Sequence, residues 1–152
     1  MIQLIPISAK EILQLPEVEK LFPMTTQDYL KRDDYYFQDK FEWFLVTDDK
    51  YKNESERKTI LSIICVTDEW FEKLENDFHL SVFEVATPIR NIGIGTRILD
   101  SLIDLAIKYH YNTMSLQVRE KGLIPFYTRF GFHEEFIDPD FSYFILNIII
   151  FL

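Results

Sequence analysis

Short apolar runs bounded by polar residues recur through the first half of the chain and predict β-strands. These runs cover residues 3–7, 41–47, 59–67 and 80–86. Ser8 directly follows the first run and is suited to cap a short helix that ends near Pro16. Residues 28–36 predict a further helical segment, whereas the charged residues 70–77 predict an irregular connection. The first half therefore predicts a strand, a helical region and three strands.

One strongly amphipathic helix dominates the second half. Apolar residues recur at helical spacing from residue 98 to residue 109, with charged residues on the opposite side. The remaining patterns predict a strand at 114–118, a short helix at 122–130, and a hairpin formed by residues 132–137 and 141–150. Together the two halves predict an α/β sandwich built around a mixed sheet.

Length and composition favour one folded domain over residues 1–152. Hydrophobic residues make up 47% of the 152 residues, which is ample for a packed core. The net charge of −9 argues against nucleic acid as a partner, because nonspecific nucleic-acid binding depends on basic side chains that neutralise phosphates. An acidic surface steers cationic substrates towards a protein, although the same charge also serves simple solubility.

The cysteine, the histidines and the two chain ends narrow the class of protein further. Cys65 is the single cysteine and lies in an apolar run, so we expect a buried thiol and no intrachain disulfide. The three histidines lack metal-ligand spacing, and no metal is expected. The N-terminus lacks a basic signal-peptide region, and the apolar residues 141–152 are shorter than the roughly 20 needed to span a membrane. We therefore expect a cytoplasmic protein with no membrane association.

A glycine-containing segment from Arg90 to Thr96 links the strand at 80–86 to the amphipathic helix. A helix N-terminus offers unpaired N–H groups and a positive dipole end, and glycines allow a ligand to approach the backbone. The segment is therefore suited to a diphosphate, with Arg90 as a counter-charge. A Walker A loop is excluded because Gly95 is followed by Thr96-Arg97 and not by Lys-Ser/Thr, and a Rossmann fingerprint is excluded because Ile98 replaces its third glycine. The alternative is an ordinary turn into a helix.

Two motifs in this order resemble the GNAT superfamily of N-acetyltransferases. Arg90-x-x-Gly93-x-Gly95 resembles the family's acetyl-CoA diphosphate loop. Phe126-Tyr-Thr-Arg-Phe-Gly-Phe132 is similar to the family's Phe-Tyr-x-x-x-Gly-Phe segment. The resemblance implies a mixed, mostly antiparallel sheet of six to seven strands, flanked by helices and splayed in the middle. It also implies transfer of an acetyl group from acetyl-CoA to an amine.

The resemblance assigns roles to individual residues. It implies that backbone groups of Val85, Ala86 and Thr87 pair with the pantetheine arm of CoA. It implies that the diphosphate is held by the N–H groups of Asn91, Ile92, Gly93, Ile94, Gly95 and Thr96. Tyr127 matches the tyrosine that protonates the departing thiolate, and a phenol with a pKa of about 10 is chemically suited to this task. The alternative for Tyr127 is an aromatic side chain that packs on the sheet.

A general base is harder to identify. Glu84 lies in the strand before the loop, where a carboxylate is otherwise disfavoured, and is the candidate base. It would equally suit an exposed face of the strand. Gln117 stands where the ribosomal-protein acetyltransferases of the superfamily carry a glutamate, which argues against their mechanism here. Other candidates without a supporting motif are Glu42, Asp68, Glu69 and His79.

Three functional hypotheses follow. The first is direct acetyl transfer to a primary amine, such as a polyamine, another small amine or a protein amine. The second is a non-catalytic module that binds acyl-CoA in a regulatory role. The third is a homodimer formed through the apolar residues 144–152, for which the alternative is a last core strand.

Overall fold

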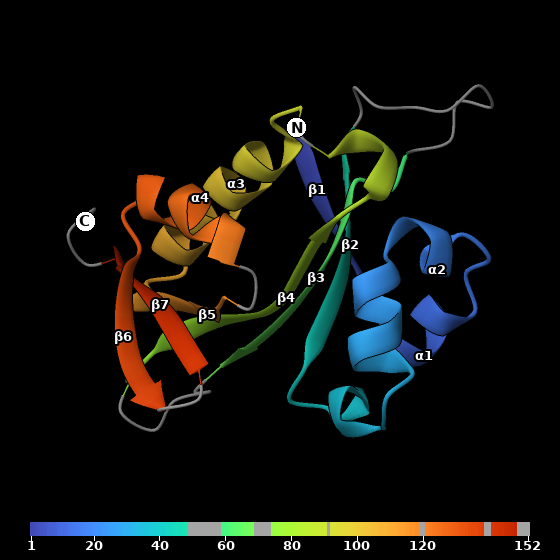
Figure 1. Cartoon of the computed structure of the whole chain (residues 1–152), viewed down its shortest axis with the longest axis horizontal. Helices are drawn as coiled ribbons and strands as arrows, with labels where there is room; N and C mark the ends of the chain where they lie inside the picture. The colour runs from blue at the N-terminus through green and yellow to red at the C-terminus, as the bar shows by residue number, and fades with distance from the viewer. Residues whose placement is uncertain (49–58, 69–73, 91, 119–120, 139–140, 149–152) are drawn as a thin grey trace. The chain divides into compact units, whose positions relative to one another are not determined.

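The computed structural model describes residues 1–48, 59–68, 74–90, 92–118, 121–138 and 141–148 (Figure 1). Its strands are β1 (Ile2–Ile7), β2 (Glu42–Asp48), β3 (Ser62–Asp68), β4 (Asp77–Val85), β5 (Thr113–Gln117), β6 (His133–Asp138) and β7 (Phe141–Asn147). Its α-helices are α1 (Ala9–Leu13), α2 (Val18–Leu21), α3 (Ile94–Lys108) and α4 (Ile124–Arg129). A π-helix η1 (Thr25–Leu30) and three 3-10 turns, η2 (Tyr35–Phe37), η3 (Thr87–Ile89) and η4 (Lys121–Leu123), complete the described elements.

The strands form a seven-stranded sheet in the order β1-β2-β3-β4-β5-β7-β6. The pairs β1–β2, β2–β3, β5–β7 and β6–β7 are antiparallel, whereas β4 and β5 run parallel. The mixed, mostly antiparallel sheet flanked by helices is confirmed. None of the described helices combines the length and the hydrophobicity needed to cross a membrane.

Internal contacts group the chain into two compact units. Unit 1 comprises Met1–Val66 and Val82–Ser101, and unit 2 comprises Thr67–Ser81 and Leu102–Leu152. The boundaries run through β3, β4 and α3, so each of these elements contributes residues to both units. The expectation of a single domain over residues 1–152 stays a prediction.

In unit 1, the helix after the first strand begins as the sequence predicts. The Ser8 hydroxyl accepts a hydrogen bond from the Glu11 N–H at 3.1 Å, and the Glu11 carboxylate accepts one from the Ser8 N–H at 3.2 Å. This reciprocal pair is a capping box, which satisfies backbone donors at the helix start. Ile12 then lies fully buried in the core of the unit.

The helix predicted over residues 28–36 is replaced by two short elements. A π-helix covers Thr25–Leu30, and a 3-10 turn covers Tyr35–Phe37. The N–H groups of Met24 and Thr25 are bonded to Glu84, about sixty residues away in sequence. This long-range contact sets where the helical turn starts, and local periodicity does not reveal it.

In unit 2, β4 begins at Asp77, three residues earlier than predicted. Residues 77–80 of β4 pair in parallel with residues 113–116 of β5. The fully buried Asp77 carboxylate accepts a hydrogen bond from the Thr113 hydroxyl at 2.7 Å and another from the Ser115 hydroxyl. The polar start of β4 is therefore stabilised by its neighbour strand rather than by apolar burial.

The predicted hairpin at the end of the chain is present in unit 2 (Figure 1). β7 pairs with β5 on one side and with β6 on the other, and its residues Tyr143–Leu146 are buried. This placement agrees with a core strand rather than a free edge. Residues 149–152 of the proposed dimer segment lie outside the described residues, and a homodimer stays a prediction. Cys65, in unit 1, is fully buried as expected.

Gly131 ends the α4 segment in a conformation that disfavours other residues. Its φ is +98°, and a Cβ at this position would lie 3.2 Å from the Leu146 side chain. We expect Gly131→Ala to lower the free energy of unfolding by about 1–2 kcal/mol. Gly122→Ala is the matched control, because nothing lies within 4 Å of its Cβ position. Chemical denaturation of both variants tests this, and equal stability of the two would contradict it.

Candidate functional site

The loop between β4 and α3, which lies within unit 1, is open to a ligand at its glycine. Gly93 has a φ of +85°, and a Cβ there would meet nothing within 4 Å. The first backbone bond of the helix runs from the Arg97 N–H to the Gly93 carbonyl, so the N–H groups of Ile94, Gly95 and Thr96 precede the helical ladder. The first turn of α3 contains no acidic residue. An anion is therefore favoured at this helix end.

Arg90 and Arg97 flank this loop, and each is paired with an acidic residue. The Arg90 guanidinium donates to the Glu84 carboxylate at 2.8 Å and to the Val85 carbonyl at 3.1 Å, while its side chain stays 44% exposed. Arg97 donates to the fully buried Asp48 at 2.6 Å. An anion in the loop would thus be bound mainly by main-chain N–H groups, with Arg90 shared between the anion and Glu84.

Glu84 is a buried carboxylate with three donors. Its side chain is 4% exposed and accepts hydrogen bonds from the Thr25 N–H at 2.8 Å, the Met24 N–H at 3.2 Å and Arg90. Such charge-assisted bonds offset the cost of removing a carboxylate from water. In this geometry Glu84 anchors the loop to the segment between α2 and η1. Its role as a general base stays a prediction.

Main-chain groups at the end of β4 face the two opposite edges of the strand. The Ala86 N–H donates to the Leu61 carbonyl at 2.8 Å, and the Glu84 carbonyl accepts from the Ser62 hydroxyl at 2.7 Å, so both residues direct their main-chain groups towards β3. Because these groups alternate along a strand, the Val85 N–H points to the opposite edge. Binding of the pantetheine arm by Val85, Ala86 and Thr87 stays a prediction.

Thr87 and the start of the diphosphate segment complete the expected binding residues. The Thr87 hydroxyl donates to the Leu21 carbonyl at 3.1 Å, which ties the turn after β4 to α2. Ile92 is 62% exposed in front of Gly93. Asn91 lies outside the described residues.

Tyr127 lies on α4 in unit 2. Its side chain is buried, and its ring contacts Phe126 and Phe132 edge-on, with centroids 5.0 and 5.8 Å apart. The Tyr127 carbonyl accepts from the N–H groups of Phe130 and Phe132, which closes the helix end before β6. The aromatic motif thus folds into a compact turn that fixes the tyrosine ring.

His79, Ser115 and Asp77 form a second buried polar cluster, in unit 2, which the sequence did not predict. The Ser115 hydroxyl donates to Asp77, so it accepts from His79 Nδ1 at 2.8 Å, which places the imidazole proton on Nδ1. Burial lowers the pKa of His79 from 6.5 to about 3. A nitrogen this weakly basic is poorly matched to proton abstraction at neutral pH.

The remaining base candidates are less well placed or lie outside the description. Glu42 is exposed at the start of β2. The Asp68 side chain and Glu69 lie outside the described residues. Among the described residues, no group of three or more His, Cys, Asp or Glu side chains is arranged to hold a metal ion.

The low pKa of His79 predicts a pH-dependent stability. Below pH 6.5 the unfolded chain takes up a proton that the folded imidazole takes up only near pH 3, so stability decreases as the pH falls through this window. Relative to His79→Gln, the wild type should lose about 2 kcal/mol of unfolding free energy between pH 7 and pH 5. Urea denaturation at several pH values measures the difference. Parallel pH profiles for the two proteins would contradict the assignment.

Comparisons with known proteins identify the fold. An N-acetyltransferase PaiA from Thermoplasma acidophilum, solved with coenzyme A, aligns over 97% of this chain and 99% of its own, with 15% identity and a TM-score of 0.65. A Bacillus subtilis acetyltransferase in complex with CoA aligns over 96% and 97%, with 14% identity and a TM-score of 0.66. The KacTA–DNA complex aligns over 98% and 94%, with 12% identity and a TM-score of 0.66.

Sequence comparison gives the family. No curated protein matches the sequence significantly. The profile of the acetyltransferase (GNAT) family matches residues 11–132, which include both motifs and all the elements from α2 to α4. This chain therefore belongs to the acetyltransferase (GNAT) family.

Proposed function

We propose that this protein transfers an acetyl group from acetyl-CoA to a primary amine. Membership of the GNAT family supports acyl transfer in general. The observation that carries the finer proposal is the loop at Gly93, where an unhindered positive-φ glycine precedes the N–H groups that come before the helical hydrogen bonds of α3. This arrangement suits the diphosphate of a CoA thioester.

The residues of unit 1 would hold the acyl donor. The N–H groups from Asn91 to Thr96 would bind the diphosphate, and backbone groups of Val85, Ala86 and Thr87 would pair with the pantetheine arm. The Ala86 N–H already donates to Leu61, so the Val85 N–H would serve the thioester carbonyl at the end of the pantetheine arm. We further propose that the acyl chain lies beside the end of β4, beyond Leu80, where the register of β4 with β5 ends.

Three groups of the chain would act on the reaction itself. Acetyl-CoA supplies the acetyl group as a thioester. The Val85 N–H would stabilise the oxygen of the thioester carbonyl while a neutral amine attacks its carbon. The Tyr127 hydroxyl would give a proton to the departing sulfur, and Glu84 is the proposed acceptor of the amine proton.

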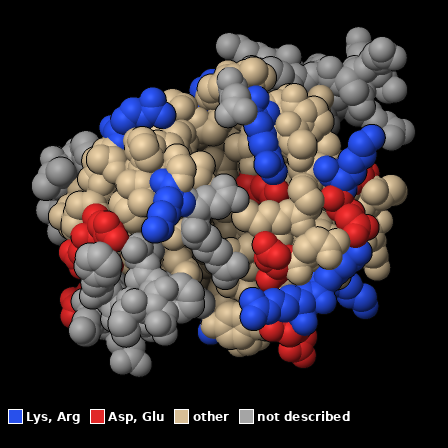
Figure 2. All heavy atoms as spheres, viewed as in Figure 1, with Lys and Arg blue, Asp and Glu red and all other residues tan. Residues whose placement is uncertain are grey.

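The proposed acceptor is an amine that is cationic in solution and becomes neutral before it attacks. The net charge of −9 favours a polyamine, another small amine or a protein amine. Figure 2 shows acidic and basic side chains interspersed on the visible face, so net charge alone does not mark an acceptor site there. One solved neighbour is bound to DNA, but at 12% identity it supports the fold only.

A non-catalytic acyl-CoA-binding module is the second candidate. The observation in its favour is that both oxygens of the Glu84 carboxylate already accept hydrogen bonds. A carboxylate held in this way anchors the loop without needing to take a proton. Turnover of acetyl-CoA separates the two functions.

A transfer assay with a panel of amines tests the proposed activity. We expect wild-type protein to form an N-acetylated amine and free CoA. Tyr127→Phe should lower kcat by about a hundredfold while leaving the affinity for CoA unchanged, because the hydroxyl acts only on the leaving sulfur. Tyr109→Phe is the matched control, since the Tyr109 side chain is 62% exposed. CoA binding without any product would contradict catalysis and support the non-catalytic module.

The same assay separates the two roles of Glu84. If Glu84 is the base, Glu84→Gln should abolish the low-pH limb of the kcat/KM profile, whatever the effect on CoA affinity. As an anchor alone, the variant should weaken CoA binding and lower the melting temperature, with the shape of the pH profile preserved.

A further inference from the structure

The Arg90 side chain occupies two groups of unit 1 that the proposed reaction needs. Its Nη2 donates to Glu84 Oε2 at 2.8 Å, and its Nε donates to the Val85 carbonyl at 3.1 Å. Glu84 is the proposed proton acceptor, and backbone groups of Val85 are proposed to pair with the pantetheine arm. In this structure one guanidinium therefore lies on both.

The Val85 carbonyl lies on the edge of β4 that faces away from β3. The main-chain groups of its two neighbours are directed towards β3, because the Ala86 N–H donates to the Leu61 carbonyl and the Glu84 carbonyl accepts from the Ser62 hydroxyl. In a strand the N–H and the carbonyl of one residue point to the same side, so the Val85 carbonyl shares the edge of the Val85 N–H. A pantetheine arm paired along this edge would meet the Arg90 side chain.

The two oxygens of the Glu84 carboxylate are not equally engaged. Oε1 accepts one bond, from the Thr25 N–H at 2.8 Å, whereas Oε2 accepts from both the Arg90 guanidinium and the Met24 N–H, the latter at 3.2 Å. The Glu84 side chain is 4% exposed, so bulk water has little access to either oxygen. Departure of Arg90 would leave Oε2 able to accept a proton, while the two main-chain donors still hold the carboxylate in place.

The guanidinium can move from these partners to the glycine loop. The Arg90 side chain is 44% exposed, although its partner carboxylate is buried. Arg90 precedes Gly93 by three residues, which span at most about 10 Å, so an anion in the loop lies within reach of a long arginine side chain. A diphosphate is more highly charged than one carboxylate, and a guanidinium binds it in a bidentate manner. Such an anion would draw Arg90 away from Glu84 and Val85.

We propose that Arg90 is a positioning residue that keeps Glu84 and the Val85 carbonyl occupied until a diphosphate binds at Gly93. The sharing of Arg90 between the two anions is then an exchange. It uncovers the carbonyl for the pantetheine arm and leaves Glu84 Oε2 able to take the proton of the attacking amine. This inference rests on the proposed function, since it requires the diphosphate of the acyl donor in the loop. By linkage, the ion pair that diphosphate binding breaks must itself oppose that binding.

NMR spectroscopy of nitrogen-labelled protein titrated with CoA tests the exchange without any turnover. The reporters are the Arg90 Nε–H, which donates to the Val85 carbonyl, and the Met24 amide, which shares Glu84 Oε2 with Arg90. Arg90→Met keeps a long side chain without its donors, so it uncovers both groups in the absence of CoA. Its matched control is Arg32→Met, which removes the same charge at an exposed position of unit 1.

We expect saturating CoA to shift both reporters in the wild type, with the Met24 amide proton moving downfield because its acceptor is no longer shared. In Arg90→Met this proton should lie downfield before CoA is added and move little afterwards, while Arg32→Met should respond as the wild type does.

The wild-type titration decides the question even if Arg90→Met does not fold. Shifts at the Gly95 and Thr96 amides with unmoved Arg90 and Met24 resonances would overturn this inference and leave the CoA site at the loop standing. A Met24 amide that responds to CoA in folded Arg90→Met as it does in the wild type would also overturn it. If none of these resonances responds, CoA does not bind, and the proposed diphosphate site fails together with this inference.

Discussion

A carboxylate inside a protein must find hydrogen-bond donors, and Glu84 meets this constraint by joining three segments of unit 1. Glu84 itself lies in β4. Its backbone donors belong to Met24 and Thr25, at the start of the π-helix η1, and its guanidinium donor belongs to Arg90, just before the glycine loop. Removing a carboxylate from water costs on the order of several kcal/mol, so these partners must stay in place together. The position of the loop and the start of η1 therefore depend on the same buried charge.

Local sequence patterns predict the elements that are stabilised locally. The capping pair at Ser8, the amphipathic helix α3 and the strands flanked by turns all carry their signals within a few residues. The elements that differ from prediction depend on distant partners. Asp77 extends β4 because Thr113 and Ser115 on β5 bind its carboxylate, and η1 starts where Glu84 accepts its N–H groups. Periodicity contains no information about such contacts.

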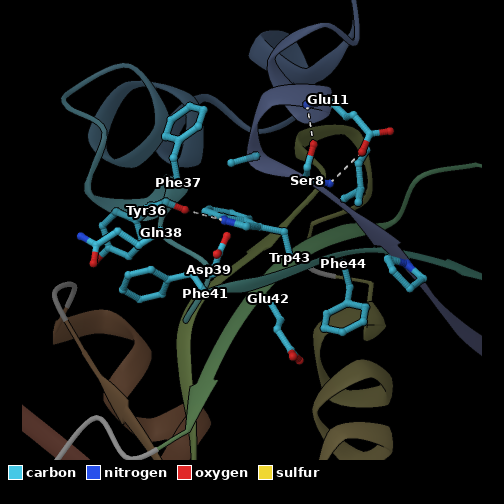
Figure 3. A pocket seen from close by; sticks show the side chains of 13 residues that line it. Ser8, Glu11, Tyr36, Phe37, Gln38, Asp39, Phe41, Glu42, Trp43 and Phe44 are labelled. Carbon is cyan, nitrogen blue, oxygen red and sulfur yellow. Dashed lines mark hydrogen bonds between the residues drawn. The ribbon is translucent and has the colours of Figure 1, made fainter.

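The same division applies to the candidate site: its local motifs could be predicted from the sequence, and its long-range contacts could not. The glycine loop and the aromatic motif were predicted from their resemblance to family motifs, and the positive φ of Gly93 and Gly131 gives the physical reason for these two glycines. The ion pair between Arg90 and Glu84 was not predicted, because it depends on the turn after β4 and no sequence pattern indicates that these two side chains meet. A pocket lined by Tyr36, Phe41 and Trp43 together with Asp39 and Glu42 (Figure 3) was also not predicted, because it forms only when the fold brings these residues together.

The central claim is that the loop at Gly93 binds the diphosphate of CoA. Isothermal titration with CoA of the wild type, Gly93→Glu and Gly122→Glu tests it most directly. Gly93→Glu places a carboxylate where the diphosphate is proposed to bind, whereas Gly122→Glu adds the same charge at an exposed glycine on η4. The account predicts micromolar binding that is lost in Gly93→Glu and retained in Gly122→Glu. Undiminished binding by folded Gly93→Glu, or no binding by the wild type, would contradict it.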